Sequence, residues 1–421
     1  MKILLLNTSE KIGGAAIACH RLMDALNANG VKAKMLVRDK QTANPNIVNI
    51  NTNKWEKAFN KWRFLWEKIV IFLHNGFSKK KLFRVSIANT GTDISKHPLV
   101  QKADVIHLHW INHGFLSLKD IERLSYLGKP IVWTMHDMWP CTGICHHSRE
   151  CNAYYEQCHH CFYLHANSKN RDLSYQIFLQ KLSLSRISDI HYVTCSFWLK
   201  DRAEKSALLF NHTCINIPNP ININLYHPKD SIDAREKLSL PKNQKLILFG
   251  SAKITDERKG IAYMIKACEI LHSRSNNKAV SLVVFGTQSD VIKDSVPFPV
   301  YSLNYLSKTE DIIHLYNAVD LYVTPSLDEN LPNTIMESMA CGTPCVGFNT
   351  GGIPEMIDHK TNGYVANYKD AEDLANGICW VLEEANYEQL SQNARQKVVE
   401  NYSEDVVAKR YLTLYKSLLS E

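Results

Sequence analysis

The sequence predicts an α/β protein with two domains, each built around a parallel β-sheet. Apolar runs alternate with segments of helical periodicity from the first residue onward, which is typical of strand–helix–strand units. The same alternation starts again after residues 215–228, a stretch whose three prolines and four asparagines oppose a continuous helix and favour a linker. A chain of 421 residues is long enough for two or three domains.

The expected strands are short apolar runs that fall into two groups. Those of the first domain lie at residues 3–6, 33–37, 105–109, 131–135 and 191–195. Those of the second domain lie at residues 245–249, 282–285, 321–324 and 345–348. Continuous rather than alternating apolar runs indicate strands that are buried on both faces, as in parallel sheets covered by helices.

The composition is that of an ordinary globular protein, with 45% hydrophobic and 22% charged residues. A disordered or collagen-like chain is therefore excluded. No apolar run reaches the roughly 18 residues that a membrane-spanning helix needs. The apolar stretch at residues 3–6 is too short for a secretory signal peptide. We therefore expect a cytoplasmic protein.

The positive charge of the chain is concentrated in residues 54–84, which hold nine lysines or arginines and two glutamates. An apolar stripe at helical spacing runs through this segment: Trp55, Phe59, Trp62, Trp66 and Ile69. Such a helix suits the headgroup layer of an anionic membrane, because the rings insert while lysines are attracted to acidic lipid. Alternatively, the stripe packs on the domain's own sheet and the charges are its solvated face. Nucleic acid is not expected, because no binding motif accompanies the charge.

Gly13 and Gly14 follow the first expected strand and open a helix. The free amides and the dipole at a helix N-terminus favour an anion, such as a phosphate group. The dinucleotide pattern G-x-G-x-x-G is absent, so a nicotinamide enzyme is not supported. The plain alternative is a tight turn between strand and helix.

Glu329 and Glu337 form the most specific pattern in the chain, E-x7-E, within PSLDENLPNTIMESMACGTPCV at residues 325–346. The first glutamate is expected in a turn after a strand and the second in a helix that starts near Asn333. Two carboxylates placed in this way can accept hydrogen bonds from the hydroxyl groups of a sugar and a ribose. From spacing alone, both could equally be solvated acids.

The sequences around this pattern resemble the retaining glycosyltransferases of family 4, which have the GT-B fold of two facing Rossmann-like domains. The resemblance covers nearly the whole chain, including FGSAKITDERKG at 249–260, the IPNP linker and GGIPEMI at 351–357. Within the family, HDMWPCTG at 136–143 and the cysteines after it look most like the branch of colanic-acid and capsule transferases. The resemblance implies a glycosyltransferase that acts in the biosynthesis of a cell-surface polysaccharide, such as a capsule or exopolysaccharide.

The resemblance assigns the acidic motif to a nucleotide-sugar donor. Glu337 matches the residue that holds the ribose hydroxyls, and Glu329 matches the one that contacts the transferred sugar. The backbone amides of Asn330 and Leu331 are implied to lie close to the sugar or the diphosphate.

Charged and glycine residues outside the acidic motif also match family positions. Lys259 matches a diphosphate-binding lysine, and Lys253 stands where the family usually has arginine, so the charge is kept but the bidentate fork is lost. Gly13 and Gly14 match the loop that approaches the donor phosphates from the first domain. His136 matches a histidine near the reacting sugar. His136 and Glu329 are the candidate catalytic residues.

The resemblance implies that residues 1–216 bind the acceptor, a glycan or lipid-linked glycan, and that residues 217–385 bind a UDP- or GDP-sugar. Residues 386–421 are implied to pack back on the first domain. Acceptor choice is expected to involve His109 and His113, together with the basic helix and the cysteine loop. If the basic helix touches membrane, the protein is peripheral at the inner face of the cytoplasmic membrane.

The chain contains no D-x-D sequence, the usual metal–diphosphate clamp, so no metal is expected to be required for catalysis. Fixed lysines and amides can stabilise the departing diphosphate instead. The family implies retention at the anomeric carbon. Because no nucleophile is evident, a same-face displacement is the preferred hypothesis.

Five cysteines lie within residues 141–161, interleaved with histidines. In a cytoplasmic protein, close thiolates favour a soft metal such as zinc. The expected ligands of a structural zinc are Cys145, Cys151, Cys158 and Cys161. Reduced thiols and disulfides are the alternatives, because the motif fixes the number of ligands but not their geometry.

Two other functions fit parts of the sequence. One is a sugar-nucleotide epimerase on the same fold, which would consume the donor without an acceptor. The other is a non-catalytic protein that binds a membrane or a partner and keeps a vestigial donor site. The intact set of Glu329, Glu337 and Lys259 disfavours this second alternative.

Overall fold

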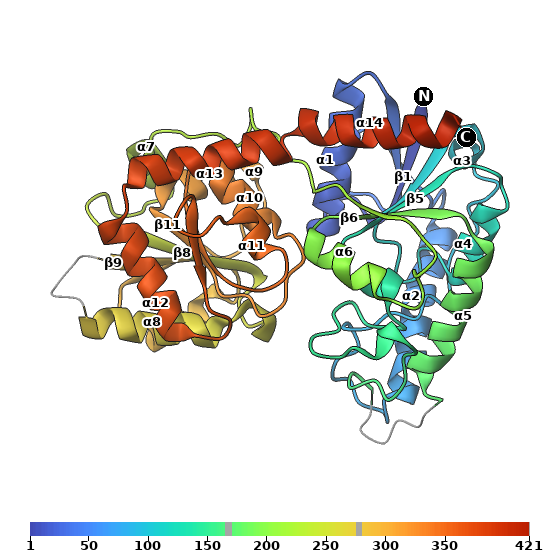
Figure 1. The fold of residues 1–421 in the computed structure, drawn as a ribbon, viewed down its shortest axis with the longest axis horizontal. Coiled ribbons are helices and arrows are strands. Elements are labelled where there is room, and N and C mark those ends of the chain that lie inside the picture. The colour runs from blue at the N-terminus through green and yellow to red at the C-terminus, as the bar shows by residue number, and fades with distance from the viewer. Residues whose placement is uncertain (165–170, 275–279, 421) are drawn as a thin grey trace. The chain divides into compact units, whose positions relative to one another are not determined.

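The computed structural model describes residues 1–164, 171–274 and 280–420 (Figure 1). Their contacts divide the chain into two compact units. The first unit contains Met1–Pro220 together with Val407–Glu421, and the second contains Ile221–Val406. No helix among the described residues is long and apolar enough to cross a membrane.

A seven-stranded parallel sheet, counted over the described residues, forms the centre of the first unit, in the order β3-β2-β1-β4-β5-β6-β7. Its strands are β1 (Lys2–Ser9), β2 (Lys32–Asp39), β3 (Ile47–Asn49), β4 (Val105–Leu108), β5 (Ile131–Met135), β6 (Ile190–Thr194) and β7 (Cys214–Asn216). Its main helices are α1 (Gly14–Ala28), α2 (Lys54–His74), α3 (Pro98–Lys102), α4 (Leu118–Ser125), α5 (Leu173–Ile187) and α6 (Phe197–Glu204). Short 3-10 turns η1 (Trp139–Cys141) and η2 (Ala153–Tyr155) lie in the cysteine loop.

Alternate residues of the central strand β1 enter different cores, because side chains along a strand point to opposite faces. Ile3 and Leu5 pack with residues of α1 and of the C-terminal helix, whereas Leu4 and Leu6 pack with residues of α4 and α5. Helices therefore cover both faces of this sheet, which explains why its strands are continuous apolar runs.

A six-stranded parallel sheet, again within the described residues, forms the centre of the second unit, in the order β10-β9-β8-β11-β12-β13. Its strands are β8 (Lys245–Lys253), β9 (Val280–Thr287), β10 (Val300–Ser302), β11 (Leu321–Thr324), β12 (Cys345–Phe348) and β13 (Gly363–Ala366). Its helices include α7 (Ser231–Lys237), α8 (Ile261–Arg274), α9 (Thr309–Ala318), α10 (Asn333–Ala340), α11 (Ile353–Met356) and α12 (Ala371–Cys379). The 3-10 helices η3 (Glu257–Lys259) and η4 (Ser289–Ser295) and the π-helix η5 (Trp380–Glu384) complete it.

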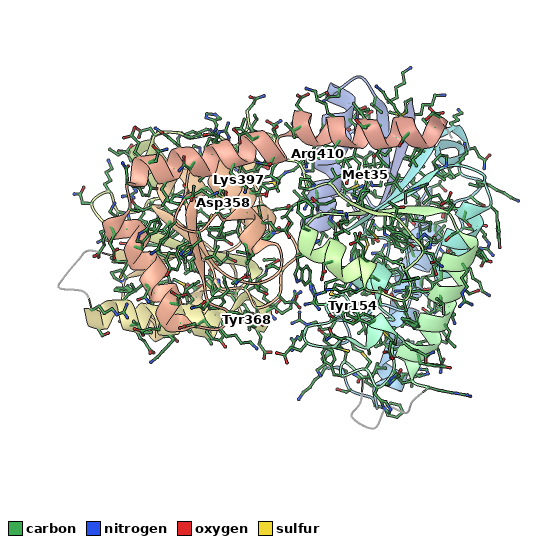
Figure 2. The ribbon with its side chains drawn as sticks, in the orientation of Figure 1. Met35, Tyr154, Asp358, Tyr368, Lys397 and Arg410 are labelled. Carbon is green, nitrogen blue, oxygen red and sulfur yellow. The ribbon has the colours of Figure 1, made fainter. Side chains whose placement is uncertain are left out.

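The C-terminal segment divides between the two units, which differs from the expectation that all of residues 386–421 pack on the first. Helix α13 (Tyr387–Tyr402) is bound to the second unit, where the Lys397 ammonium lies 2.9 Å from a carboxylate oxygen of Asp358 (Figure 2). Helix α14 (Glu404–Ser420) belongs to the first unit from Val407 onward. There Tyr415 shares a 2.7 Å hydrogen bond with His107 of β4.

Candidate functional site

Three of the predicted donor-site residues lie at the carboxyl ends of β8 and β11, which are neighbours in the second sheet. Ligands of open α/β sheets bind at this edge, because the loops that follow the strands meet there. Lys253 is the last residue of β8, Lys259 ends the turn η3 that follows it, and Glu329 lies in the loop after β11.

A direct ion pair joins two of these predicted residues, because the Lys259 ammonium donates to Oε1 of Glu329. The hydroxyl of Ser326 donates to the same oxygen at 3.1 Å. The side chains of Lys259 and Glu329 are 29% and 14% exposed, so the pair is reachable from solvent but fixed by its surroundings. Lys253 is exposed, and its carbonyl accepts the amide of Asp256 at 3.1 Å.

Two glycines let the loops around this pair approach one another closely. Gly260 has φ of 70°, and a Cβ there would lie 1.8 Å from the carbonyl oxygen of Pro325. Gly351 has φ of 58°, and a Cβ there would lie 1.7 Å from the carbonyl oxygen of Glu329. Next to it, the amide of Gly352 donates to the carbonyl of Asn330 at 2.8 Å. The GGIPEMI motif, to which sequence reasoning assigned no role, therefore supports the loop that carries Glu329.

Glu337 lies on α10, which begins at Asn333. Asn330 and Leu331, just before this helix, are buried. Its side chain is buried, with 7% of the residue exposed, and Oε2 accepts the hydroxyl of Tyr316 at 3.2 Å. Burial raises the pKa of Tyr316 well above its usual value, and the nearby carboxylate adds to this, so the hydroxyl stays a donor. Sequence reasoning missed Tyr316, because no spacing connects α9 to the acidic motif.

In the first unit, Gly13 precedes α1 with φ of 92° and ψ of 159°. A Cβ at this position would have no heavy atom within 4 Å, so the backbone conformation rather than crowding favours glycine. The carbonyl of Gly13 accepts the amides of Ala16 and Ile17 at 3.1 and 3.2 Å, which starts the helix. Gly14 is its first residue.

His136 follows β5 and lies beside His109, which follows β4. The ring nitrogens His109 Nδ1 and His136 Nε2 are 2.9 Å apart, so one of them donates to the other. Burial lowers the pKa of His136 to about 4, and it lowers that of His109 well below the usual value. Both rings are therefore neutral at neutral pH and can exchange donor and acceptor roles.

His113 also lies at this edge, in the loop that follows β4. Burial, with the nearby Lys68 ammonium, lowers its pKa to about 2, and its Nε2 is buried with no hydrogen-bond partner in the described structure. The structure thus brings together His109 and His136 at the carboxyl edge of the first sheet, and places His113 on the same side through the β4 loop.

Asp137 connects this edge to the cysteine loop. One of its carboxylate oxygens accepts His146 Nδ1 at 2.7 Å and the indole N–H of Trp110 at 2.9 Å. Burial alone would raise the pKa of Asp137, but His146 outweighs it and holds this pKa well below its usual value. Sequence reasoning missed this role of Asp137 and His146, although the neighbouring His136 was singled out.

The cysteines of residues 141–161 are free thiols in this structure. Across the described residues, no three side chains of His, Cys, Asp or Glu are arranged to hold a metal ion. Burial raises the pKa of the Cys158 thiol to about 11 and that of Cys161 to about 12, so both stay protonated at neutral pH. The four ligands predicted from sequence, which include Cys145 and Cys151, are not gathered in such a group among the described residues. Structural zinc stays a prediction.

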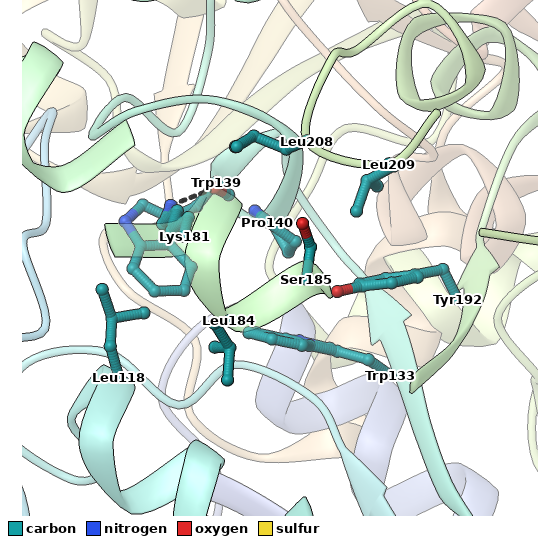
Figure 3. Close-up of a pocket in the computed structure, with 10 residues that line it drawn as sticks. All are labelled: Leu118, Trp133, Trp139, Pro140, Lys181, Leu184, Ser185, Tyr192, Leu208 and Leu209. Carbon is teal, nitrogen blue, oxygen red and sulfur yellow. Dashed lines mark hydrogen bonds between the residues drawn. The ribbon is translucent and has the colours of Figure 1, made fainter. Parts of the chain in front are cut away.

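A small cavity in the first unit is lined by none of these residues (Figure 3). Its wall is largely apolar and includes Trp133, Leu184 and Tyr192. The one ammonium in its lining, that of Lys181, donates to the carbonyls of Trp139 and Thr142 at 2.5 and 2.9 Å. Burial lowers the pKa of Lys181 to about 7. Because its lining contains none of the predicted site residues, this cavity is not the candidate site.

Residues 230–397, which carry the Lys259–Glu329 pair and Glu337, match the family Glycosyl transferases group 1. The second unit is a group 1 glycosyltransferase domain. An uncharacterised glycosyltransferase of Methanocaldococcus jannaschii is 27% identical over 422 aligned positions, which cover 96% of this chain and 94% of the relative. These matches support the same family for the chain as a whole, but not the colanic-acid and capsule branch.

Other relatives match shorter stretches. The N,N'-diacetylbacillosaminyl-diphospho-undecaprenol α-1,3-N-acetylgalactosaminyltransferase of Campylobacter jejuni is 34% identical over 119 residues, which cover 28% of this chain and 31% of that protein. The matched stretch is therefore less than a third of that relative.

Solved structures show the fold. A glycosyltransferase of Rickettsia africae has a TM-score of 0.67 at 14% identity and covers 100% of this chain and 99% of its own. Anabaena HepE in complex with UDP-glucose has a TM-score of 0.62 at 17% identity, and the match covers 99% of this chain and 100% of HepE. The chain therefore has the GT-B fold, as the resemblance implied.

The close approach at Gly351 yields a stability prediction. Replacing Gly351 with alanine forces its loop away from Glu329, so we expect the free energy of unfolding to fall by at least about 3 kcal/mol. Gly128→Ala is the matched control, because Gly128 has φ of 63° and open space around it. There only the backbone strain of about 1 kcal/mol should appear. Equal losses in urea denaturation would contradict the proposed crowding.

The buried His107 yields a pH prediction. Burial and the neighbouring His136 lower its pKa to about 3, so the unfolded chain binds a proton that the folded chain does not as pH falls below about 6.5. Stability is therefore lost on acidification, by about 2 kcal/mol from this group between pH 7 and pH 5.

In His107→Gln this contribution disappears. The difference in unfolding free energy between pH 7 and pH 5 should then shrink by about 2 kcal/mol relative to wild type. Denaturation at the two pH values measures it, and an overall loss of stability in the variant cancels in the comparison. An unchanged pH difference would mean that His107 titrates normally in the folded protein.

Proposed function

We propose that this glycosyltransferase moves a sugar from a nucleotide-sugar donor to a glycan or lipid-linked glycan, with retention at the anomeric carbon, in the assembly of a cell-surface polysaccharide. The observation that carries the proposal is the Lys259–Glu329 pair at the carboxyl ends of β8 and β11. It joins a cation suited to phosphate with a carboxylate suited to sugar hydroxyls, within the stretch that matches the transferase family.

In this proposal the donor is held by the second unit. The Glu337 carboxylate accepts hydrogen bonds from the ribose hydroxyls, while Tyr316 keeps the carboxylate in place. Lys259 and the exposed Lys253 neutralise the diphosphate as the leaving group gains charge. Glu329, released from Lys259 by the arriving phosphate, then accepts a hydroxyl of the transferred sugar.

Backbone groups complete the proposed donor site. The amides of Asn330 and Leu331 are proposed to donate to the sugar or the diphosphate, and those at Gly13 and Gly14 to the phosphates, as expected of a helix start. With cations and amides available for the charge, we propose that transfer needs no metal.

The relatives support the substrate classes of the proposal. The HepE structure contains UDP-glucose, which supports a UDP-sugar as the first donor to test, with GDP-sugars next. The Campylobacter jejuni relative acts, by its name, on a diphospho-undecaprenol-linked sugar, which supports a lipid-linked acceptor. A lipid-linked acceptor would place the enzyme at the inner face of the cytoplasmic membrane.

On the acceptor side, we propose that His136 contacts the reacting sugar and that His109 positions it. A neutral ring can donate to, or accept from, a hydroxyl without adding charge to the site. No side chain is proposed as a nucleophile, and the acceptor hydroxyl is proposed to attack from the face that the diphosphate leaves, which gives retention.

The donor site is tested by thermal unfolding with a panel of sugar nucleotides. We expect one donor to stabilise the wild type by about 2.7 kcal/mol at 100 times its dissociation constant. Glu337→Ala should lose this stabilisation, because the ribose hydroxyls lose their acceptor. Glu236→Ala, which removes an exposed carboxylate elsewhere in the second unit, should keep it. No shift with any donor would contradict the proposed donor site.

The stereochemistry is tested by proton NMR of the product made from an α-linked donor. An α-linked product is expected from same-face displacement, and a β-linked product would refute it. Donor that is consumed without any acceptor would instead favour a sugar-nucleotide epimerase. If a donor binds but is never consumed, the protein is a binding protein with a vestigial site.

A further inference from the structure

Helix α2 presents its apolar side chains to solvent rather than to the core of the first unit. The exposed fractions of Trp55, Phe59 and Trp62 are 79%, 60% and 54%. The stripe continues through Trp66, Ile69 and Leu73, which are 40%, 37% and 50% exposed. At 100° per residue these six positions fall on one side of the helix. The alternative that the stripe packs on the domain's own sheet is therefore wrong.

The opposite side of α2 is buried and combines the apolar Ile71 with polar side chains. Glu67 is 0% exposed, and its Oε1 accepts the amides of Ile87 and Ala88 at 2.8 and 3.3 Å. The Lys68 ammonium, also buried, donates to the carbonyls of Leu82 and Val85 at 3.2 and 3.3 Å. Rotating α2 to bury its stripe would break these bonds and leave the amides of Ile87 and Ala88 and the carbonyls of Leu82 and Val85 without these partners, so the exposed stripe is fixed by the fold.

Further contacts fix the first half of the helix. The guanidinium of Arg63 donates to Asn60 and to Thr92, both at 2.8 Å. A Cβ on Gly114, whose φ is 80°, would lie 2.9 Å from the backbone nitrogen of Phe64, so the β4 loop lies against the α2 backbone. The stripe is thus displayed from a rigid element.

The surface around the stripe is basic. The exposed lysines are Lys54, Lys57 and Lys61 on α2 and Lys79, Lys80 and Lys81 in the loop that follows. Of the two glutamates in residues 54–84, Glu67 is buried and only Glu56 is partly exposed. Large apolar side chains within a basic surface are unfavourable in water alone but match a layer of anionic headgroups over hydrocarbon.

We propose that α2 and the loop of residues 75–84 dock on an anionic phospholipid bilayer. The rings of the stripe enter the boundary between headgroups and acyl chains, and the lysines contact acidic headgroups. A second copy of the chain fits less well, because two such basic surfaces repel each other. The proposal does not depend on the donor chemistry, since lipid binding is measured without any sugar nucleotide.

The test is co-sedimentation of the full chain with vesicles of phosphatidylcholine and phosphatidylglycerol in equal amounts. Wild type is expected to bind, with weaker binding at high salt. The double variant Trp62→Ser, Trp66→Ser should bind at least about tenfold more weakly, because ring insertion is lost. The charge reversal of Lys79, Lys80 and Lys81 to glutamate should have a similar effect.

Phe210→Ser is the matched control, since Phe210 is 80% exposed in the first unit but outside this surface, and its binding should equal that of wild type. All variants change exposed side chains, and unchanged melting curves verify that they fold. The proposal is overturned if wild type does not sediment with the vesicles, if both surface variants bind like wild type, or if neutral phosphatidylcholine vesicles bind equally well. Concentration-dependent dimers that the tryptophan variant abolishes would identify a second copy as the occupant.

Discussion

The close approach of three loops at the carboxyl edge of the second sheet is the constraint on which the candidate donor site depends. Gly260 lies against Pro325 and Gly351 against Glu329, at separations that no side chain would permit. This contact fixes the backbone that carries Glu329 and brings it within reach of Lys259. A flexible loop would have to be ordered by the ligand, at an entropic cost that a rigid loop avoids.

Burial keeps the candidate histidines of the first unit uncharged, whereas the second unit pairs Lys259 with Glu329. His109 and His136 share a hydrogen bond and have lowered pKa values. Asp137, one residue further, has its pKa lowered chiefly by His146, and it also accepts the indole N–H of Trp110. A charged aspartate beside neutral imidazoles gives this edge a fixed polarity, which suits the orientation of hydroxyl groups better than the binding of a phosphate.

Sequence reasoning located the inner strands of both sheets and the acidic motif. It did not locate the edge strands or the side chains that hydrogen-bond to the candidate site residues. All nine expected strands overlap observed ones, because continuous apolar runs identify strands buried on both faces. The strands β3, β7, β10 and β13 were missed, since they have only three or four residues and all four lie at sheet edges. The hydrogen bond from Tyr316 to Glu337 arises from tertiary packing, which no spacing in the sequence encodes.

Helix α2 shows why periodicity alone gave two interpretations of the same stripe. An apolar stripe identifies one side of a helix. Whether that side or the opposite side faces the core depends on the partners that the opposite side finds in the fold. Here Glu67 decides it, because the amides of Ile87 and Ala88 are paired by its carboxylate in this orientation and would lose that acceptor if the stripe faced the core. Gly114 then connects this helix to the loop that holds His113, so the orientation of the exposed stripe and the placement of that histidine depend on the same backbone contact.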